Sequence, residues 1–116
     1  MARVKRGVTA HRRHKRLLHA AEGRKGTRST LIRPAREALL HAMAYAYAGR
    51  KQRKRQLRAL WIVRLNAAAR QQGLTYARLV GGLKSAGVIL DRKVLADIAV
   101  RDAATFARIA EVARAQ

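Results

Sequence analysis

Residues 50–70 read RKQRKRQLRALWIVRLNAAAR, a block of cations that runs directly into an apolar, alanine-rich segment. Nearly all of these residues are strong helix formers, so the sequence predicts that both halves of the stretch share one helix. On a 3.6-residue period Leu57, Trp61 and Leu65 gather on one side, while the cations of residues 50–58 cover most of the circumference one turn earlier. Such a basic helix surface cannot pack against protein and requires water or an anionic partner.

The net charge narrows the class of partner. The 116 residues hold 27 Lys and Arg against 6 Asp and Glu, a formal net charge of +21. A field of one sign and this size favours polyanions, of which RNA and DNA are the commonest, and an acidic membrane surface is the other candidate. Residues 1–58 hold 18 cations and 2 anions, whereas residues 59–116 hold 9 and 4. We therefore expect a basic RNA-binding arm and long helix in residues 1–58 and a small globular all-α domain in residues 59–116.

The amino-terminal half of the predicted all-α fold consists of an extended basic arm and a long projecting helix. Residues 1–28 form the arm, and a short helix is expected within it from about Thr9, the candidate cap, to Ala21. This arm holds too few apolar residues to bury a face, so we expect it to be largely disordered until a partner binds.

The long helix is expected to begin near Thr30, with Ser29 or Thr30 as its cap and Pro34 in its first turn. No proline interrupts residues 35–72, which would span about 57 Å as a helix. Gly49 is the one weak point, where a bend would separate Tyr45 and Tyr47 from the cations that begin at Arg50, and Gly73 suits the left-handed position after the last turn.

Three short helices are expected to complete a small C-terminal helical domain. Thr75 can cap residues 76–86, Asp91 can cap residues 92–100, and Asp102 can cap residues 103–113. The pair Gly81–Gly82 lies inside the first of these helices, where it would allow close approach of another helix or of a phosphate. The side chains predicted to face inward, together with Trp61, Ile62 and Leu65, are Leu79, Val80, Leu83, Val94, Leu95, Ile98, Phe106, Ile109, Ala110 and Val112.

Residues for catalysis or cofactor binding are missing from the sequence. The chain has no cysteine, and His11, His14, His19 and His41 lie among arginines with few acids nearby, so they form a poor metal site and are better read as phosphate or base contacts. The acids Asp91, Asp97, Asp102 and Glu111 are explained as helix caps or surface groups. No apolar run has the length of a signal peptide or a transmembrane helix. We expect no enzyme activity, no cofactor and no metal.

RNA is the preferred polyanion, and two other partners stay open. A DNA major groove is usually read by one face of a short recognition helix, whereas a rod surrounded by cations suits the interior of a folded RNA. The alternatives are a histone-like DNA-binding protein and a cationic membrane-active helix, although the apolar residues of the long helix are mostly alanine. Tyr45, Tyr47, Trp61 and Tyr76 could stack on bases, but Trp61 has helical spacing with Leu57 and Leu65 and is expected in the core.

Several motifs spread along the whole chain resemble one family. They are Met1-Ala2-Arg3-Val4-Lys5-Arg6-Gly7, Tyr45-Ala46-Tyr47, Arg53-Lys54-Arg55, Leu60-Trp61-Ile62-Val63-Arg64-Leu65-Asn66-Ala67-Ala68-Ala69-Arg70, Gly82-Leu83-Lys84, Asp91-Arg92-Lys93 and Leu95-Ala96-Asp97. On these residues the chain resembles the bacterial large-subunit (50S) ribosomal protein L-twenty family. It departs from the family at Arg24-Lys25, where members commonly have an aromatic residue after the glycine, and at Pro34.

The resemblance implies a structural constituent of the large ribosomal subunit that binds 23S ribosomal RNA directly and supports early subunit assembly. It also implies neighbouring large-subunit ribosomal proteins as partners, a cytoplasmic location in the ribosome with an organellar ribosome as the weaker alternative, and for some members repression of their own messenger RNA. We expect the chain neither to bind a membrane nor to form a homo-oligomer. The residues expected to face RNA, from the cationic segments and from matching motif positions, are Arg3, Lys5, Arg6, Arg12, Arg13, His14, Lys15, Arg16, Arg24, Lys25, Arg28, Arg33, Arg36, Arg50, Lys51, Arg53, Lys54, Arg55, Arg58, Arg64, Arg70, Lys84, Arg92 and Lys93.

Overall fold

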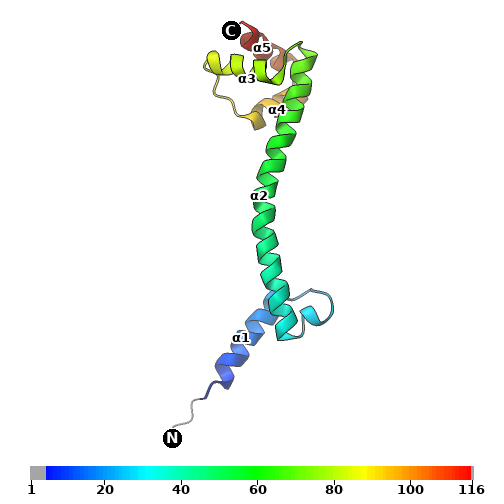
Figure 1. The fold of residues 1–116 in the computed structure, drawn as a ribbon, viewed down its shortest axis with the longest axis vertical. Coiled ribbons are helices and arrows are strands. Elements are labelled where there is room, and N and C mark those ends of the chain that lie inside the picture. Colours follow the sequence, from blue (N-terminus) through cyan, green and yellow to red (C-terminus); the bar gives the residue numbers. More distant parts are fainter. Residues whose placement is uncertain (1–4, 116) are drawn as a thin grey trace. The chain divides into compact units, whose positions relative to one another are not determined.

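The computed structural model describes residues 5–115, and within them every regular element is a helix (Figure 1). The predicted all-α fold, with one long helix and a small C-terminal helical domain, is confirmed. The elements are α1 (Gly7–Ala20), the 3₁₀ turn η1 (Gly26–Arg28), α2 (Ile32–Gln71), α3 (Tyr76–Ser85), α4 (Arg92–Arg101) and α5 (Ala103–Arg114).

The chain divides into two compact units, and the boundary lies inside α2. The N-terminal unit ends at Lys51 and the C-terminal unit begins at Gln52. The predicted division into residues 1–58 and 59–116 is based on charge and function, whereas these units are defined by contacts within the structure. The predicted division therefore stays a prediction.

A helix is present in the basic arm, but it begins at Gly7, two residues before the predicted start. Thr9 does not cap this helix, because the N-cap position belongs to Arg6 and no side chain bonds there. Instead the Thr9 hydroxyl donates to the Arg6 carbonyl at 3.0 Å. This is the back-bonding that a threonine makes once it lies inside a helical turn.

The turn between α1 and α2 depends on glycine. Gly23 and Gly26 have φ angles of 80° and 64°, which L-residues with a side chain rarely adopt. Ser29 takes part in this turn, since its hydroxyl donates to the Gly26 carbonyl at 3.0 Å. Helix α2 then begins at Ile32, two residues later than predicted, with Pro34 in its first turn as expected.

The N-terminal unit has almost no hydrophobic core. Among its described residues only Ala21 and Ala35 are buried. Its larger apolar side chains, such as Leu17, Leu18 and Ile32, are only half-buried, so no large side chain among the described residues of this unit is fully removed from water.

Helix α2 is 40 residues long and continues through Gly49, so no break occurs at the predicted weak point. It ends as predicted at Gly73, whose φ is 72°. The Leu74 amide donates to the Ala69 carbonyl at 2.9 Å and the Gly73 amide to the Arg70 carbonyl at 3.0 Å. These two bonds satisfy carbonyls that the end of the helix would otherwise leave open.

All three predicted caps of the C-terminal unit are present. The side chains of Thr75, Asp91 and Asp102 accept from backbone amides three residues ahead, at 3.3, 2.7 and 2.9 Å. At Asp102 the hydroxyl of Thr105 donates to the carboxylate as well, and this bond, followed by the Thr105 backbone amide, lowers the pKa of the Asp102 carboxyl below its ordinary value.

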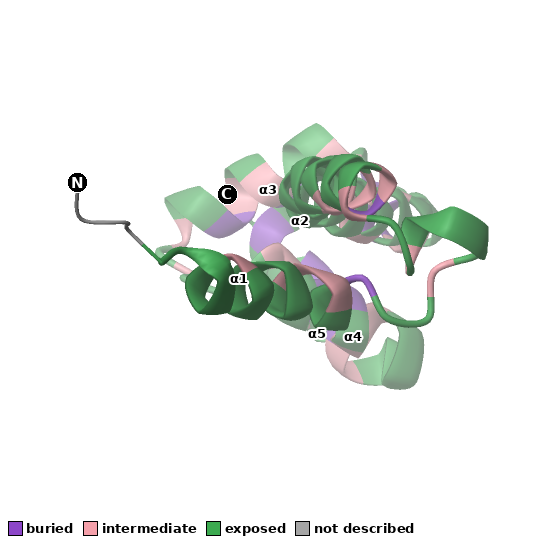
Figure 2. Ribbon diagram, turned by 90° about the horizontal axis from the view of Figure 1, so that it is seen from below, coloured by how far each residue is buried: buried purple, intermediate pink, exposed green. Residues whose placement is uncertain are grey.

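The hydrophobic core belongs to the C-terminal unit (Figure 2). Trp61 is half-buried and packs against this core, as expected. Two predictions are wrong, since Val94 and Val112 are 43% and 46% exposed and the buried positions belong to Ala96 and Ala113. The buried core residues are Leu65, Ala69, Leu74, Leu79, Leu83, Leu95, Ala96, Phe106, Ala110 and Ala113.

Small residues are needed in this core because two helices approach closely at Gly82. A Cβ atom on Gly82 would lie 2.7 Å from the carbonyl carbon and 2.8 Å from the Cα atom of Ala113. The predicted close approach to another helix is therefore confirmed at Gly82, where the backbone of α5 occupies the place of a side chain. At Gly81 a Cβ atom would meet nothing within 4 Å.

Candidate nucleic-acid interface

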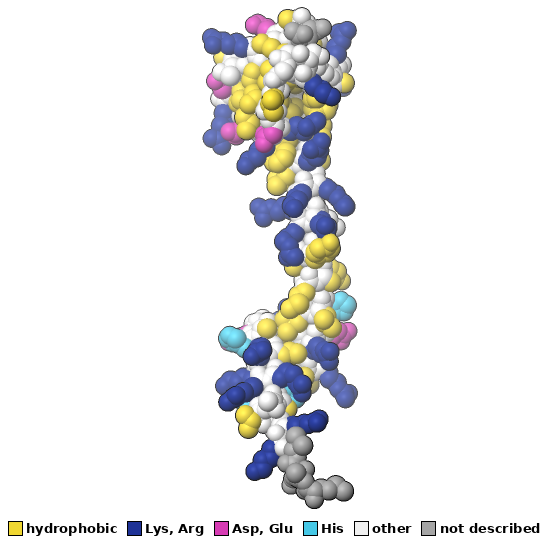
Figure 3. Space-filling model, turned by 90° about the vertical axis from the view of Figure 1, so that its left-hand side faces the viewer, with side chains coloured by type: hydrophobic (Ala, Val, Ile, Leu, Met, Phe, Trp, Pro, Cys, Tyr) yellow, Lys and Arg dark blue, Asp and Glu magenta, His cyan; other side chains and the backbone are white. Residues whose placement is uncertain are grey.

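The middle of α2 is uncovered on all sides. Every residue from Met43 to Leu60 is exposed. At 100° per residue, the six cations of residues 50–58 spread over roughly 200° of the circumference, and Gln52 and Gln56 occupy much of the remainder. Figure 3 shows lysine and arginine side chains leaving this part of the helix to both sides.

Few of the cations are neutralised within the chain. Among the described residues, Arg101 is the one lysine or arginine that forms an ion pair with a carboxylate, that of Asp97 at 2.8 Å. No Asp or Glu occurs in residues 38–90, a span that includes the whole cationic block. The positive charge of α2 is therefore directed outward, as an anionic partner requires.

The structure places the predicted RNA-facing residues on several elements. All of those described are exposed, except Arg24 and Arg92, which are half-buried. Arg3 lies outside the described residues. Lys5 and Arg6 precede α1; Arg12, Arg13, His14, Lys15 and Arg16 lie on α1; Arg24, Lys25 and Arg28 lie between α1 and α2; Arg33, Arg36, Arg50, Lys51, Arg53, Lys54, Arg55, Arg58, Arg64 and Arg70 lie on α2; Lys84 lies on α3; and Arg92 and Lys93 lie on α4.

In the C-terminal unit the fold brings Lys84 and Arg92 together around a hollow of about 440 Å³ between α3 and α4. Arg92 is held in place there, because its Nε donates to the hydroxyl of Tyr76 at 2.9 Å. A guanidinium has five donor hydrogens, so this bond leaves others for a ligand.

The aromatic residues of α2 differ in their surroundings. Tyr45 and Tyr47 are 72% and 59% exposed, and at 100° per residue they point to opposite faces of the helix. The Tyr45 ring stacks on His41 with centroids 6.1 Å apart, whereas the Lys51 ammonium lies 4.8 Å from the centre of the Tyr47 ring. Both tyrosines present an uncovered ring that a nucleobase could stack on.

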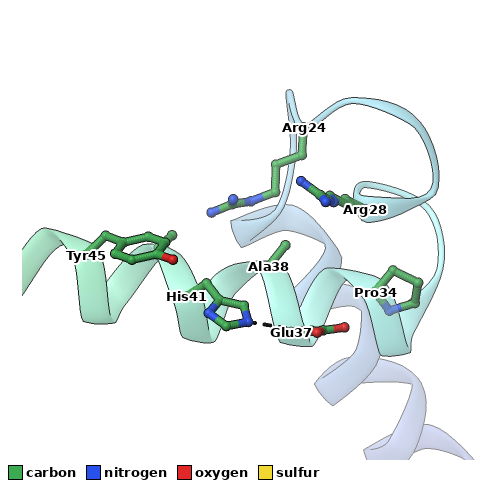
Figure 4. A pocket seen from close by; sticks show the side chains of 8 residues that line it. Arg24, Arg28, Pro34, Glu37, Ala38, His41 and Tyr45 are labelled. Atoms are coloured by element: carbon green, nitrogen blue, oxygen red, sulfur yellow. Dashed lines mark ion pairs between the residues drawn. The ribbon is translucent and has the colours of Figure 1, made fainter.

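A hollow of about 500 Å³ in the N-terminal unit brings together candidates that the sequence indicated only separately, and adds Glu37 to them (Figure 4). Arg24 and Arg28 line it from the turn before α2, and Glu37, His41 and Tyr45 line it from α2 itself. The spacing of four residues from Glu37 to His41 to Tyr45 was a usable signal, because it places all three on one face of a helix. Their meeting with Arg24 and Arg28 depends on the glycine turn.

The described residues include neither a metal-binding cluster nor a membrane-spanning helix. No group of three or more His, Cys, Asp or Glu side chains in residues 5–115 is arranged to hold a metal ion. No helix in the part of the chain that the structure describes is both long and apolar enough to cross a membrane.

These features define a class of protein: small, strongly basic and all-α, with a self-contained C-terminal core and a long helix whose cationic segment is left uncovered. Comparison with known proteins identifies the family within this class. The model of the family described as ribosomal protein L20 matches residues 3–109. The chain therefore belongs to the ribosomal protein L20 family, and the resemblance noted in the sequence is confirmed.

Curated relatives agree with this assignment along nearly the whole chain. The chain is 60% identical over 114 residues to the large ribosomal subunit protein bL20 of Acinetobacter baumannii strain ATCC 17978, a match that covers 98% of this chain and 96% of that protein. It is 57% identical over 114 residues to the protein of the same name from Roseiflexus sp. strain RS-1, covering 98% and 97%. Like these relatives, the chain is a ribosomal protein of the large subunit.

Proposed function

We propose that this chain is a structural constituent of the large ribosomal subunit that binds large-subunit ribosomal RNA directly and supports early assembly of the subunit. The observation that carries this proposal is the segment Met43–Leu60, in which every residue is exposed and six carry a positive charge. Three apolar side chains of this segment, Met43, Tyr45 and Tyr47, are 65%, 72% and 59% exposed. Such exposed apolar side chains close to one another are typical of a surface that binds a partner. A polyanion that surrounds the helix satisfies both the charge and the apolar side chains.

Folded RNA suits this helix better than duplex DNA does. Cations that spread over more than half of a helix surface can meet phosphates from several RNA strands at once, whereas a DNA groove presents phosphates along two walls only. The exposed tyrosine rings add a second reason, since unpaired bases in RNA loops and bulges offer faces for stacking and paired DNA bases do not.

The weak core of the N-terminal unit supports a role in assembly. With only Ala21 and Ala35 buried among its described residues, this unit gains most of its order from the RNA that it contacts. Binding then orders the protein and the RNA segments around it together. Because those segments must still be accessible when the protein binds, we expect the complex to form early in assembly.

The remaining parts of the proposal follow from membership in a ribosomal family. The chain acts without catalysis, in the cytoplasm and within the ribosome, next to other large-subunit proteins. It works as a single copy and not as a homo-oligomer. Repression of its own messenger RNA is an additional role, which requires an RNA site that resembles the ribosomal one.

A salt series tests the central proposal. The purified chain is titrated into a large-subunit ribosomal RNA fragment, an unrelated RNA and a duplex DNA of equal length. Affinity for all three should fall steeply with salt, because phosphate neutralisation is independent of sequence, so the informative result is the preference that survives near 150 mM salt. We expect the ribosomal RNA to remain bound there after the other two ligands dissociate. Equal dissociation of all three would contradict specific recognition and favour the histone-like reading.

A further inference from the structure

The hollow between the glycine turn and α2 has two chemically different walls. Arg24 and Arg28 form one wall, and their side chains extend over the helix surface near Ala38 (Figure 4). Tyr45 and His41 belong to the opposite wall. The volume of about 500 Å³ lies within the range of small-ligand pockets, and a single nucleotide fits a space of that size.

The arginine wall is suited to phosphate. Neither Arg24 nor Arg28 has a carboxylate partner or a side-chain hydrogen bond among residues 5–115. Two guanidinium groups that face the same space repel each other, and an anion between them removes this repulsion. A phosphate is the anion that guanidinium groups bind best, because its oxygens match their paired N–H donors.

The aromatic wall is suited to a base. The rings of His41 and Tyr45 lie 6.1 Å apart with an angle of 23° between their planes, so they already form a short stack. Tyr45 is 72% exposed, which leaves a ring surface on which one more flat ring can stack. The Glu37 carboxylate lies 3.8 Å from Nε2 of His41 and helps to orient the imidazole.

We propose that this hollow binds one unpaired nucleotide of ribosomal RNA, with its phosphate on Arg24 and Arg28 and its base stacked on Tyr45. The proposal rests on the proposed function and specifies which feature of the RNA is read. A nucleotide in a continuous helix cannot enter, because its base faces are covered by its neighbours. The site therefore selects a loop, a bulge or an extruded nucleotide.

The test compares the full-length chain with variants by chemical probing of large-subunit ribosomal RNA at saturating protein. The site variants are Tyr45→Ala and Arg24→Ala combined with Arg28→Ala. Each has a control, because Tyr47→Ala removes an exposed ring on the other face of α2 and Lys25→Ala removes an exposed cation beside the hollow. We expect the site variants to uncover the same few unpaired nucleotides, which stay protected with both controls. Tyr45→Ala should also weaken binding by roughly 5- to 150-fold, the effect of losing one base stack.

The outcomes separate this proposal from the proposed function. If the unchanged chain shows no preference for ribosomal RNA, the function itself is overturned. If it binds specifically and both site variants protect every nucleotide as before, or if Tyr47→Ala uncovers the same nucleotides as Tyr45→Ala, the nucleotide site is overturned and the function stands.

Discussion

Replacing Gly82 with alanine is expected to destabilise the C-terminal unit, although the same change usually stabilises a helix. A Cβ atom at this position would lie 2.7 Å from the carbonyl carbon of Ala113, whereas ordinary contact begins at 3.4 Å. The carbonyl oxygen of Ala113 would lie closer still, so helices α3 and α5 must separate by more than the 0.7 Å between these two distances. Because a clash between backbone and Cβ cannot be relieved by rotating a side chain, we expect a cost in the upper half of the range of about 1–3 kcal/mol that overpacking causes, and helix propensity returns about 1 kcal/mol. We expect a net loss of about 1–2 kcal/mol.

Gly81 provides a matched control one residue away in the same helix. A Cβ atom there meets nothing within 4 Å, so Gly81→Ala gains the helix propensity without the clash. This variant should be stabilised by about 0.5–1 kcal/mol. The two variants should then differ by about 1.5–3 kcal/mol, which corresponds to roughly 6–24 °C in Tm for a unit of this size.

Thermal unfolding of the full chain, followed by Trp61 fluorescence, measures this difference. Trp61 is a suitable probe because it packs against the core of the C-terminal unit. Equal Tm values for the two variants, or a Gly82→Ala variant more stable than the unchanged chain, would refute the close approach of α3 and α5.

Three further predictions concern charge, packing and pH. Combining Arg53→Gln, Lys54→Gln and Arg55→Gln should leave the Tm unchanged and reduce the slope of log affinity against log salt by about 2–3 in filter binding, because each cation neutralises about one phosphate. Trp61→Ala should destabilise the C-terminal unit in chemical denaturation by about 1–3 kcal/mol, less than for a fully buried tryptophan, and retained stability with weaker RNA binding would instead assign Trp61 to stacking. Since the folded-state pKa of Asp102 is lowered, its contribution is present above pH 4 and is lost as pH falls through the folded pKa, so the Tm advantage over Asp102→Asn should shrink in acid and a constant difference would contradict the cap.

The features that were predicted correctly from the sequence depend on interactions between residues close to each other in the chain. Thr75, Asp91 and Asp102 cap the helices that they precede, and Gly73 ends α2, because each of these interactions needs only residues within a few positions of each other. The continuity of α2 through Gly49 has the same basis, since the helix formers on both sides outweigh one glycine.

Contacts between distant residues account for the errors. Val94 and Val112 have the hydrophobicity of core residues, but the buried positions beside them belong to Leu95, Ala96 and Ala113, and at Ala113 the close approach of α3 leaves room only for a small side chain. The hollow was missed for a related reason. Arg24 and Arg28 read as part of a charged arm, and their position over α2 depends on left-handed glycines whose geometry a charge pattern does not show.

The two units reach stability by different routes, and this difference explains why one chain contains both. The C-terminal unit buries ten residues in its core and can fold before any RNA is present. The N-terminal unit buries two alanines among its described residues, so ordering it consumes part of the free energy of RNA binding. A folded unit bound first raises the local concentration of the attached cations near the RNA, so their later binding costs less entropy than the encounter of two separate molecules. Under the proposed function we therefore expect an order of events: the C-terminal unit, which includes the cations of residues 53–58, binds while the RNA is still loosely folded, and the N-terminal unit becomes fixed as the RNA closes around it.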